Sequence, residues 1–195
     1  MELIVKKIEQ DEVKTIETSF SESFLESINS PYYNQKVFKY LTYKNYFQIE
    51  DEEALKMIDI QHYYDWQYVS TSYTWDYIFL AIANEKIGID IETIRDRTPE
   101  MIDFFSEEYD LIWWKTRENF FLLWTAEECI IKTSNACFFE EGKNVKIKSL
   151  EKKEQKIWGL SFSYESIMTL NERDYKVYTW KIENLIYSIS ILVKD

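Results

Sequence analysis

The sequence contains very little glycine and proline, three and two residues among 195, where average usage of about 7% glycine would give about 14. A phosphate-binding loop or a dinucleotide fingerprint needs clustered glycines, so that backbone N–H groups can approach phosphates. Gly88, Gly142 and Gly159 lie far apart along the chain. Both motifs are therefore excluded.

Histidine and cysteine are also scarce. The single histidine, His62, excludes a zinc site built on two histidines. Cys129 and Cys137 fall in a segment expected to be one helix, where eight residues at about 1.5 Å each separate them by about 12 Å. This distance exceeds the reach of a disulfide, about 7 Å. Because there is also no leader-like N-terminus and no apolar run of about 18 residues, we expect a cytoplasmic protein with no membrane association.

Basic residues are fewer than acidic ones: the chain has 23 Lys and Arg against 35 Asp and Glu, which gives a net charge of −12. Binding to nucleic acid is therefore not expected, and an anionic ligand would need a metal ion or a local basic patch. What the chain has in abundance is apolar and aromatic residues, 46% and 17%. These suffice for a large core in one or two compact domains.

Helical and strand-like periodicities occupy separate segments, which favours an α+β fold. Helices are expected over about 37–46 and 54–58, from Ser106, and over 118–136. The predicted strands are 67–73, 77–83, 86–92, 143–150, 156–165, 174–183 and 185–193. The second and third of these are separated only by a short turn and are predicted to form a hairpin, and the last four an antiparallel meander.

The strand 86–92 is the most informative segment. Its strict alternation sends three isoleucines to one face and Gly88, Asp90 and Glu92 to the other. The two carboxylates are about 7 Å apart at the backbone, near enough to reach one hard cation, and Gly88 is expected to leave room beside them. The alternative is an edge strand with a solvated acidic face.

A second candidate constellation lies in the predicted helix 118–136. Trp124, Glu128 and Lys132 are spaced i, i+4 and i+8 and therefore share one face. A Glu and a Lys at this spacing are more often a surface ion pair. The tryptophan on the same face indicates partial burial instead.

Together these segments resemble the 4′-phosphopantetheinyl transferase superfamily, in its longer form of two similar halves. That family pairs a Gly-Ile-Asp-x-Glu strand with a downstream Trp-Ser/Thr-x-Lys-Glu-Ser/Ala-x-x-Lys helix, and the corresponding segments here are 88–92 and 124–132. Residues 104–109 look like its Phe-Phe-Ser-x-x-Glu-Tyr segment with one residue deleted, and 70–74 fall where it has Ser-x-Ser-His-Ser. The resemblance covers about residues 68–135 well.

The resemblance implies two similar α/β halves, residues 1–85 and 86–195, each with helices on a small antiparallel sheet, and a monomer as sufficient. It implies Mg²⁺-dependent transfer of 4′-phosphopantetheine from coenzyme A to a serine of an acyl- or peptidyl-carrier protein, with release of 3′,5′-ADP. The implied roles are Mg²⁺ binding by Asp90, Glu92 and Glu128, deprotonation of the serine by Glu128 or Glu108, neutralisation of the pyrophosphate and protonation of the departing 3′,5′-ADP by Lys132, and coenzyme A binding by Ser72, Tyr73, Thr74 and Lys132.

The sequence also departs from the family pattern. Tyr73 stands where the family has a histidine that meets the 3′-phosphate, and a phenol brings no positive charge. Glu127 replaces a lysine of the helix motif, a reversal of charge beside the expected phosphate site. Of the family's N-terminal basic residues, Lys36, Lys39 and Lys44 are the only nearby candidates.

These departures support an alternative hypothesis, a catalytically degenerate relative that binds a carrier protein or another partner. The intact carboxylates support an active transferase, because unpaired carboxylates repel one another and have no evident purpose without a cation. A metal-dependent phosphohydrolase is a third, less favoured hypothesis, since such enzymes usually have more clustered ligands. The six lysines within 143–156 are either a solvated strand and turn or a docking patch for an acidic carrier protein.

Overall fold

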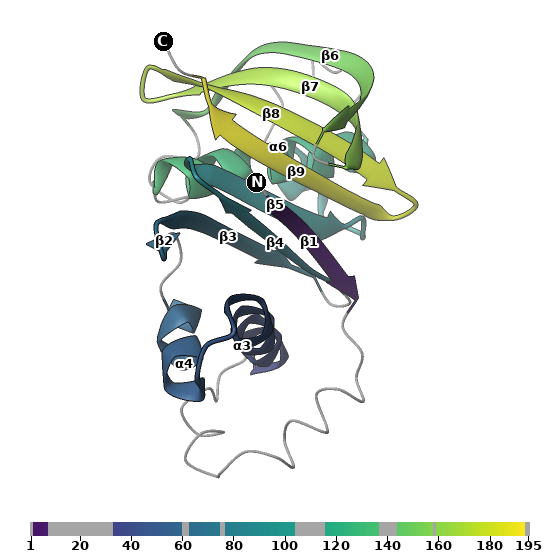
Figure 1. Cartoon of the computed structure of the whole chain (residues 1–195). Coiled ribbons are helices and arrows are strands. Elements are labelled where there is room, and N and C mark those ends of the chain that lie inside the picture. The colour runs from purple at the N-terminus through teal and green to yellow at the C-terminus, as the bar shows by residue number, and fades with distance from the viewer. Residues whose placement is uncertain are drawn as a thin grey trace.

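The chain is described here from a computed structural model, over residues 2–7, 33–59, 63–74, 77–103, 116–136, 144–157 and 159–193. Within these residues the fold is α+β, as predicted, with two antiparallel sheets and helices packed against them (Figure 1). Among the helices described, none has the length and apolar character needed to span a bilayer.

The first sheet contains four strands in the order β1-β4-β3-β2. Two helices lie against it, below the sheet in Figure 1. The elements are β1 (Glu2–Lys7), α3 (Tyr33–Phe47), α4 (Asp51–Asp59), β2 (Tyr63–Tyr64), β3 (Gln67–Tyr73) and β4 (Tyr77–Ala83). The helices and the strands 67–73 and 77–83 were predicted. Strands β1 and β2 were not predicted.

The second sheet contains five strands in the order β5-β9-β8-β7-β6. Its elements are β5 (Ile87–Thr93), α5 (Pro99–Asp103), α6 (Arg117–Ser134), β6 (Lys146–Ile157), β7 (Leu160–Leu170), β8 (Arg173–Ile182) and β9 (Leu185–Leu192). The predicted antiparallel meander is confirmed, although its first two strands extend beyond the predicted bounds. The helix predicted from Ser106 lies outside the described residues.

Helix α6 has well-defined ends. The Thr116 hydroxyl caps its N-terminus by accepting a hydrogen bond from the backbone N–H of Asn119 at 3.1 Å. Asn135 ends it in the left-handed conformation, with φ 59°. The helix predicted to hold both Cys129 and Cys137 therefore ends before Cys137, which lies outside the described residues.

The predicted hairpin between strands 77–83 and 86–92 is wrong. Strand β4 pairs with β1 on one side and β3 on the other, so it has no free edge for a further strand. Strand β5 instead pairs with β9 in the second sheet. The short turn after Ala83 therefore carries the chain from one sheet to the other.

Both halves have the same order of elements in the described part of the chain. Each begins with a strand, continues through helices, and ends in a meander whose last strand pairs antiparallel with the first. These closing pairs are β1 with β4 and β5 with β9. In the described residues, the second sheet has one strand more than the first, and the two sheets meet where β3 and β4 approach β5.

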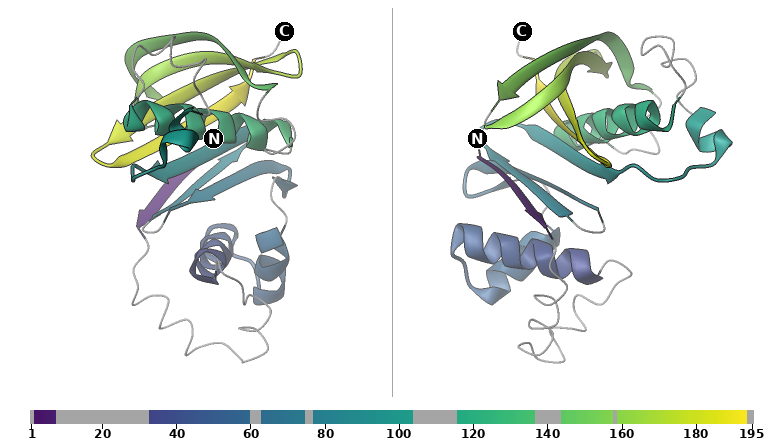
Figure 2. Two further views of the ribbon diagram at one scale, coloured as in Figure 1. Left: turned by 180° about the vertical axis from the view of Figure 1, so that it is seen from behind. Right: turned by 90° about the vertical axis from the view of Figure 1, so that its right-hand side faces the viewer.

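Three apolar cores lie between the layers of helices and sheets, whose arrangement is seen in Figure 2. Phe79 and Ala81 of β4 pack against the isoleucines of β5 between the two sheets. On the other face of the first sheet, Leu80 packs with Tyr43 and other residues of α3 and α4. Helix α6 covers the far face of the second sheet, where Phe121 and its neighbours contact β7, β8 and β9. The order of layers is therefore helices, sheet, sheet, helix.

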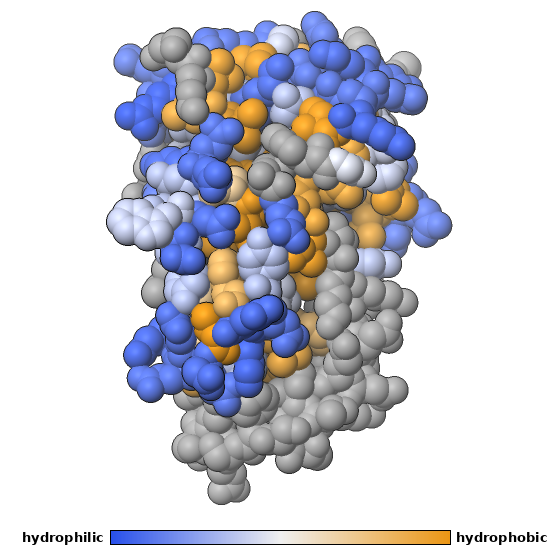
Figure 3. Space-filling view, in the orientation of Figure 1, coloured by the Kyte–Doolittle hydropathy of each residue, from blue (hydrophilic) through white to orange (hydrophobic). Residues whose placement is uncertain are grey.

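The lysine-rich segment forms most of β6, an edge strand of the second sheet. Figure 3 shows hydrophilic residues gathered over this part of the surface. Lys148 pairs with Asp174 at 2.6 Å, and Lys153 pairs with Glu165 at 3.3 Å. These contacts fit the solvated-strand hypothesis, since exposed lysines also protect a sheet edge from further pairing. The docking hypothesis stays a prediction.

Candidate functional site

A pocket of about 300 Å³ lies where the two halves meet. Its walls come from α3, β3, β5 and α6, and the residues that line it are Lys39, Ser70, Thr71, Ser72, Tyr73, Asp90, Glu92, Trp124, Glu128 and Lys132. The carboxylate strand and the helix face singled out in the sequence therefore converge on one cavity. Three segments distant in sequence supply most of its polar groups.

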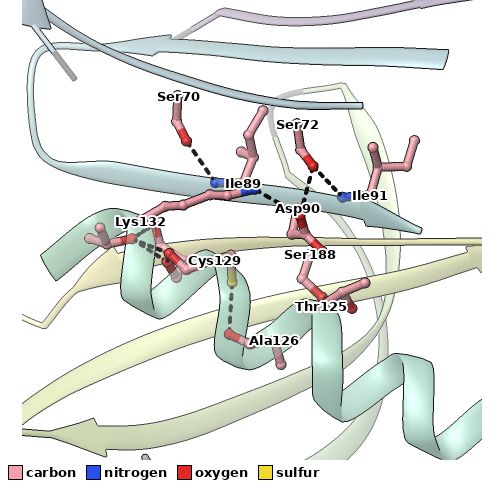
Figure 4. Close-up of polar contacts among 12 residues, drawn as sticks. Ser70, Ser72, Ile89, Asp90, Ile91, Thr125, Ala126, Cys129, Lys132 and Ser188 are labelled. Atoms are coloured by element: carbon pink, nitrogen blue, oxygen red, sulfur yellow. Dashed lines mark hydrogen bonds and ion pairs between the residues drawn. The ribbon is translucent and has the colours of Figure 1, made fainter. Parts of the chain in front are cut away.

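Asp90 lies at the centre of the polar contacts of this pocket (Figure 4). Its side chain is buried, and its Oδ1 atom accepts hydrogen bonds from Ser72 Oγ at 2.6 Å and Lys132 Nζ at 2.8 Å. Its Oδ2 atom is also buried and has no hydrogen-bond partner among the described residues. One carboxylate oxygen is thus neutralised within the protein, and the other is buried without a partner among the described residues.

Two serines of β3 hold the free edge of β5. Ser70 Oγ accepts a hydrogen bond from the backbone N–H of Ile89 at 3.1 Å, and Ser72 Oγ accepts one from Ile91 at 3.2 Å. Because Ser72 also donates to Asp90, its hydroxyl joins β3 of the first sheet to both the backbone and the carboxylate of β5 in the second (Figure 4). Ser72, predicted to contact coenzyme A, lines the pocket but has its hydroxyl engaged by these two partners.

Gly88 allows α6 to lie directly on β5. A Cβ atom at this position would be 1.9 Å from the carbonyl oxygen of Cys129 and 2.4 Å from Thr133 Oγ1. The expectation that Gly88 leaves room beside the carboxylates is therefore wrong, because the helix backbone fills that space. The same close approach brings Lys132 within reach of Asp90.

Each carboxylate in the pocket makes ionisation of its neighbours less favourable, which raises their pKa. Burial, together with the charge of Asp90, raises the pKa of Glu128 to about 7. Burial and Asp90 also raise the pKa of Glu92, against the opposing effect of Arg95. Burial alone would lower the pKa of Lys132, but Asp90 and Glu128 raise it above its ordinary value. Net negative charge is thus concentrated where a cation would be stabilised.

Of the other residues predicted to bind coenzyme A, Tyr73 lines the pocket and Thr74 does not. Tyr73 lines the pocket and is 38% exposed. Thr74 is buried away from the lining residues, with its hydroxyl 2.7 Å from that of Thr93. Glu108 lies outside the described residues, as does His62.

Of the charged residues that were compared with the family pattern, Lys39 lines the pocket, whereas Lys44 and Glu127 do not. Lys39 lines the pocket, with its Nζ donating to the carbonyl oxygen of Ile58 at 2.7 Å. Lys44 instead pairs with Asp51, away from the lining residues. Glu127 is buried and does not line the pocket, although it neighbours Glu128, which does.

Two arginines near the pocket were missed by the sequence interpretation. Arg95 Nη2 lies 3.5 Å from Glu92 Oε2, and the Arg97 guanidinium carbon lies 5.3 Å from the centre of the Phe121 ring. The signal in the sequence was an Arg-x-Arg pattern directly after the carboxylate strand.

The donor set is suited to a hard cation such as Mg²⁺. All three candidate ligands are carboxylates, and Asp90 Oδ2 is a buried acceptor without a partner among the described residues. Within the described part of the chain, no three His, Cys, Asp or Glu side chains form a ready-made metal cluster. Ion pairs of Asp90 with Lys132 and of Glu92 with Arg95 satisfy part of the charge instead.

Comparisons with known proteins give no assignment. No model of a known protein family matches this chain. A search of the curated proteins likewise finds no match. The function therefore has to be argued from the site itself.

Proposed function

We propose that this protein is a member of the 4′-phosphopantetheinyl transferase superfamily. It transfers 4′-phosphopantetheine from coenzyme A to a serine of an acyl- or peptidyl-carrier protein, with Mg²⁺ as cofactor. The observation that carries the proposal is the convergence of Asp90, Glu128 and Lys132, from two separate motif segments, on one pocket beside an unpartnered buried oxygen.

The carboxylates of Asp90, Glu92 and Glu128 would hold the cation. When bound, Mg²⁺ supplies positive charge against the pyrophosphate of coenzyme A. Relief of carboxylate repulsion favours this binding, because Asp90 raises the pKa of both glutamates above their ordinary values.

In the transfer, the serine oxygen of the carrier forms a bond to the β-phosphorus of coenzyme A. The bond from that phosphorus to the departing 3′,5′-ADP oxygen breaks, and its electron pair leaves with 3′,5′-ADP. Glu128 accepts the serine proton. Lys132 neutralises charge on the pyrophosphate as the bond breaks and donates a proton to the departing 3′,5′-ADP.

Lys39 and Trp124, which also line the pocket, would position coenzyme A. Lys39, buried at the α3 side of the pocket, adds a positive charge for a phosphate group. Trp124 stacks on Phe120 with ring centres 5.7 Å apart, which fixes an aromatic surface next to Glu128. A fixed aromatic wall limits water in the pocket and restricts where the donor can lie.

A second candidate function is a non-catalytic relative that binds a carrier protein. It is favoured by the internal ion pair of Lys132 with Asp90, which neutralises that carboxylate without a ligand. Tyr73 adds no positive charge for coenzyme A. Calorimetry separates the two functions: tight binding of a carrier with no Mg²⁺-dependent binding of coenzyme A supports the second.

The proposed transfer is tested by incubating the protein with coenzyme A, Mg²⁺ and several apo carrier proteins and weighing the carriers. We expect one carrier to gain the mass of phosphopantetheine and Asp90→Asn to abolish the gain, because the buried oxygen that faces the cation is lost. Asp174→Asn is the control, since Asp174 pairs with Lys148 on the second sheet. An unmodified panel that a known transferase does modify, or full activity of D90N, contradicts the proposal.

A further inference from the structure

The chain leaves β5 beside the pocket and carries two arginines past Glu92. Arg95 Nη2 lies 3.5 Å from Glu92 Oε2, longer than the 2.7–2.9 Å usual for charge-assisted hydrogen bonds. The Arg95 side chain is 43% exposed. An ion pair this long and this open to solvent contributes little, so Arg95 can exchange its partner at small cost.

Arg97 is held more firmly than Arg95. Its guanidinium lies over the ring of Phe121 on α6, and its Nε atom is buried without a hydrogen-bond partner among the described residues. Burial and the charge of Arg95 lower the pKa of Arg97, with Glu92 opposing. The two guanidinium groups are thus close enough to repel one another.

Around Arg95 and Arg97, the positive charges outnumber the carboxylates that are free to pair with them. Glu92 is the carboxylate that faces both arginines, and it is also a candidate ligand of the cation. Asp96, the acidic residue between them, pairs with Arg117 at 2.6 Å instead. If Glu92 turns to a cation, two positive charges remain without a carboxylate partner among the contacts described.

We propose that Arg95 and Arg97 form an anion subsite at the edge of the pocket, which binds oxygens of a diphosphate. The inference rests on the proposed function, because the pyrophosphate of coenzyme A supplies those oxygens next to the carboxylates. The guanidinium fork of Arg95 binds two phosphate oxygens at once. Arg97, which lies over the Phe121 ring, adds a second positive charge beside Arg95.

Isothermal titration with inorganic pyrophosphate and Mg²⁺ tests this subsite without any transfer step. We expect Arg95→Gln and Arg97→Gln each to weaken binding about tenfold or more, the effect of one lost charge-assisted contact. Arg95→Lys keeps the charge and loses the fork, so its affinity is expected between those of wild type and R95Q. Arg117→Gln is the control, because Arg117 is an arginine at the start of α6 that pairs with Asp96 and is not part of the proposed subsite.

The outcomes also separate this inference from the proposed function. Wild-type affinity of both R95Q and R97Q, equal weakening by R117Q, or no binding of pyrophosphate by the wild type overturns the subsite. Pyrophosphate binding that depends on Arg95, in a protein that modifies no carrier, supports the subsite and contradicts the transferase. Thermal unfolding shows whether each variant is folded. If R97Q is not folded, the pyrophosphate affinity of R95Q alone tests the subsite.

Discussion

At the scale of single residues, the scarcity of glycine has a direct structural consequence. Left-handed backbone positions are taken by other residues, which are Gln48, Asp65, Trp66, Asn135, Asn171, Glu172 and Glu183 in the described part of the chain. Asn171 and Glu172 form a two-residue turn between β7 and β8, with φ values of 51° and 64°. This is the geometry of a type I′ turn, which strongly prefers glycine at its second position.

Glu172→Gly is therefore expected to stabilise the protein. Removing Cβ relieves the left-handed strain, and a gain of about 0.5 to 1 kcal/mol is expected after the greater entropy of glycine in the unfolded chain. Urea unfolding measures the change. Glu151→Gly, an exposed position within β6, is the control and should lower stability. A loss of stability in E172G contradicts the strain argument.

The pocket carboxylates predict an unusual pH dependence. Burial raises the pKa of Glu128 from 4.5 to about 7, so the folded protein binds this proton more tightly than the unfolded chain does. The metal-free protein should therefore lose stability as pH rises from about 4.5 to 7, on the order of 2 kcal/mol from this group. Glu128→Gln should remove much of that loss, with the remainder due to Glu92.

Urea unfolding in the presence of a chelator, at several pH values between 5 and 8, measures this effect. Glu118→Gln is the matched control, because Glu118 lies on the same helix but pairs with Lys181 near the surface. An E128Q variant that loses as much stability as the wild type between pH 5 and 8 would show that Glu128 does not titrate in this range.

At the scale of elements, the contact between β5 and α6 decides the geometry of the site. The Asp90–Lys132 ion pair depends on a helix lying directly on an edge strand, which only the absence of a side chain at Gly88 permits. The serines of β3 then fix the other side of β5. A single strand is thus positioned from both sides by contacts outside its own sheet.

Gly88→Ala should separate this strand from the helix. The added Cβ would meet the backbone carbonyl of Cys129, which cannot move without shifting α6. We expect a loss of about 3 kcal/mol or more in the free energy of unfolding and weaker binding of Mg²⁺. Gly159→Ala is the control: no atom lies within 4 Å of its added Cβ, so it incurs only left-handed strain at φ 83°, about 1 kcal/mol. Equal losses for the two variants would contradict the account of Gly88.

At the scale of the whole molecule, the pocket exists because the two halves pack together. One half supplies Lys39 and the residues of β3, and the other supplies Asp90 and the face of α6. Neither half contains the complete lining. Binding of a ligand is therefore expected to stabilise the two halves together rather than one of them.

Most of the local elements and the candidate groups could be predicted from the sequence. Alternation placed Asp90 and Glu92 on one face of a strand, and the spacing of Glu128 and Lys132 placed them on one face of a helix, because both patterns follow from backbone periodicity alone. Local signals could not show which strands pair, so β5 was joined to β4 instead of β9. Which strands pair depends on which strand edges already have a partner, and both edges of β4 do.

Only the tertiary structure decided the role of Gly88, the engagement of Ser72 and the place of the two arginines. Each depends on contacts between segments far apart in the chain, such as Ser72 with Asp90 and Arg97 with Phe121. The few glycines exclude a phosphate loop from sequence alone. That one of them admits a helix backbone, which brings a lysine to a carboxylate, depends on packing that no local pattern contains.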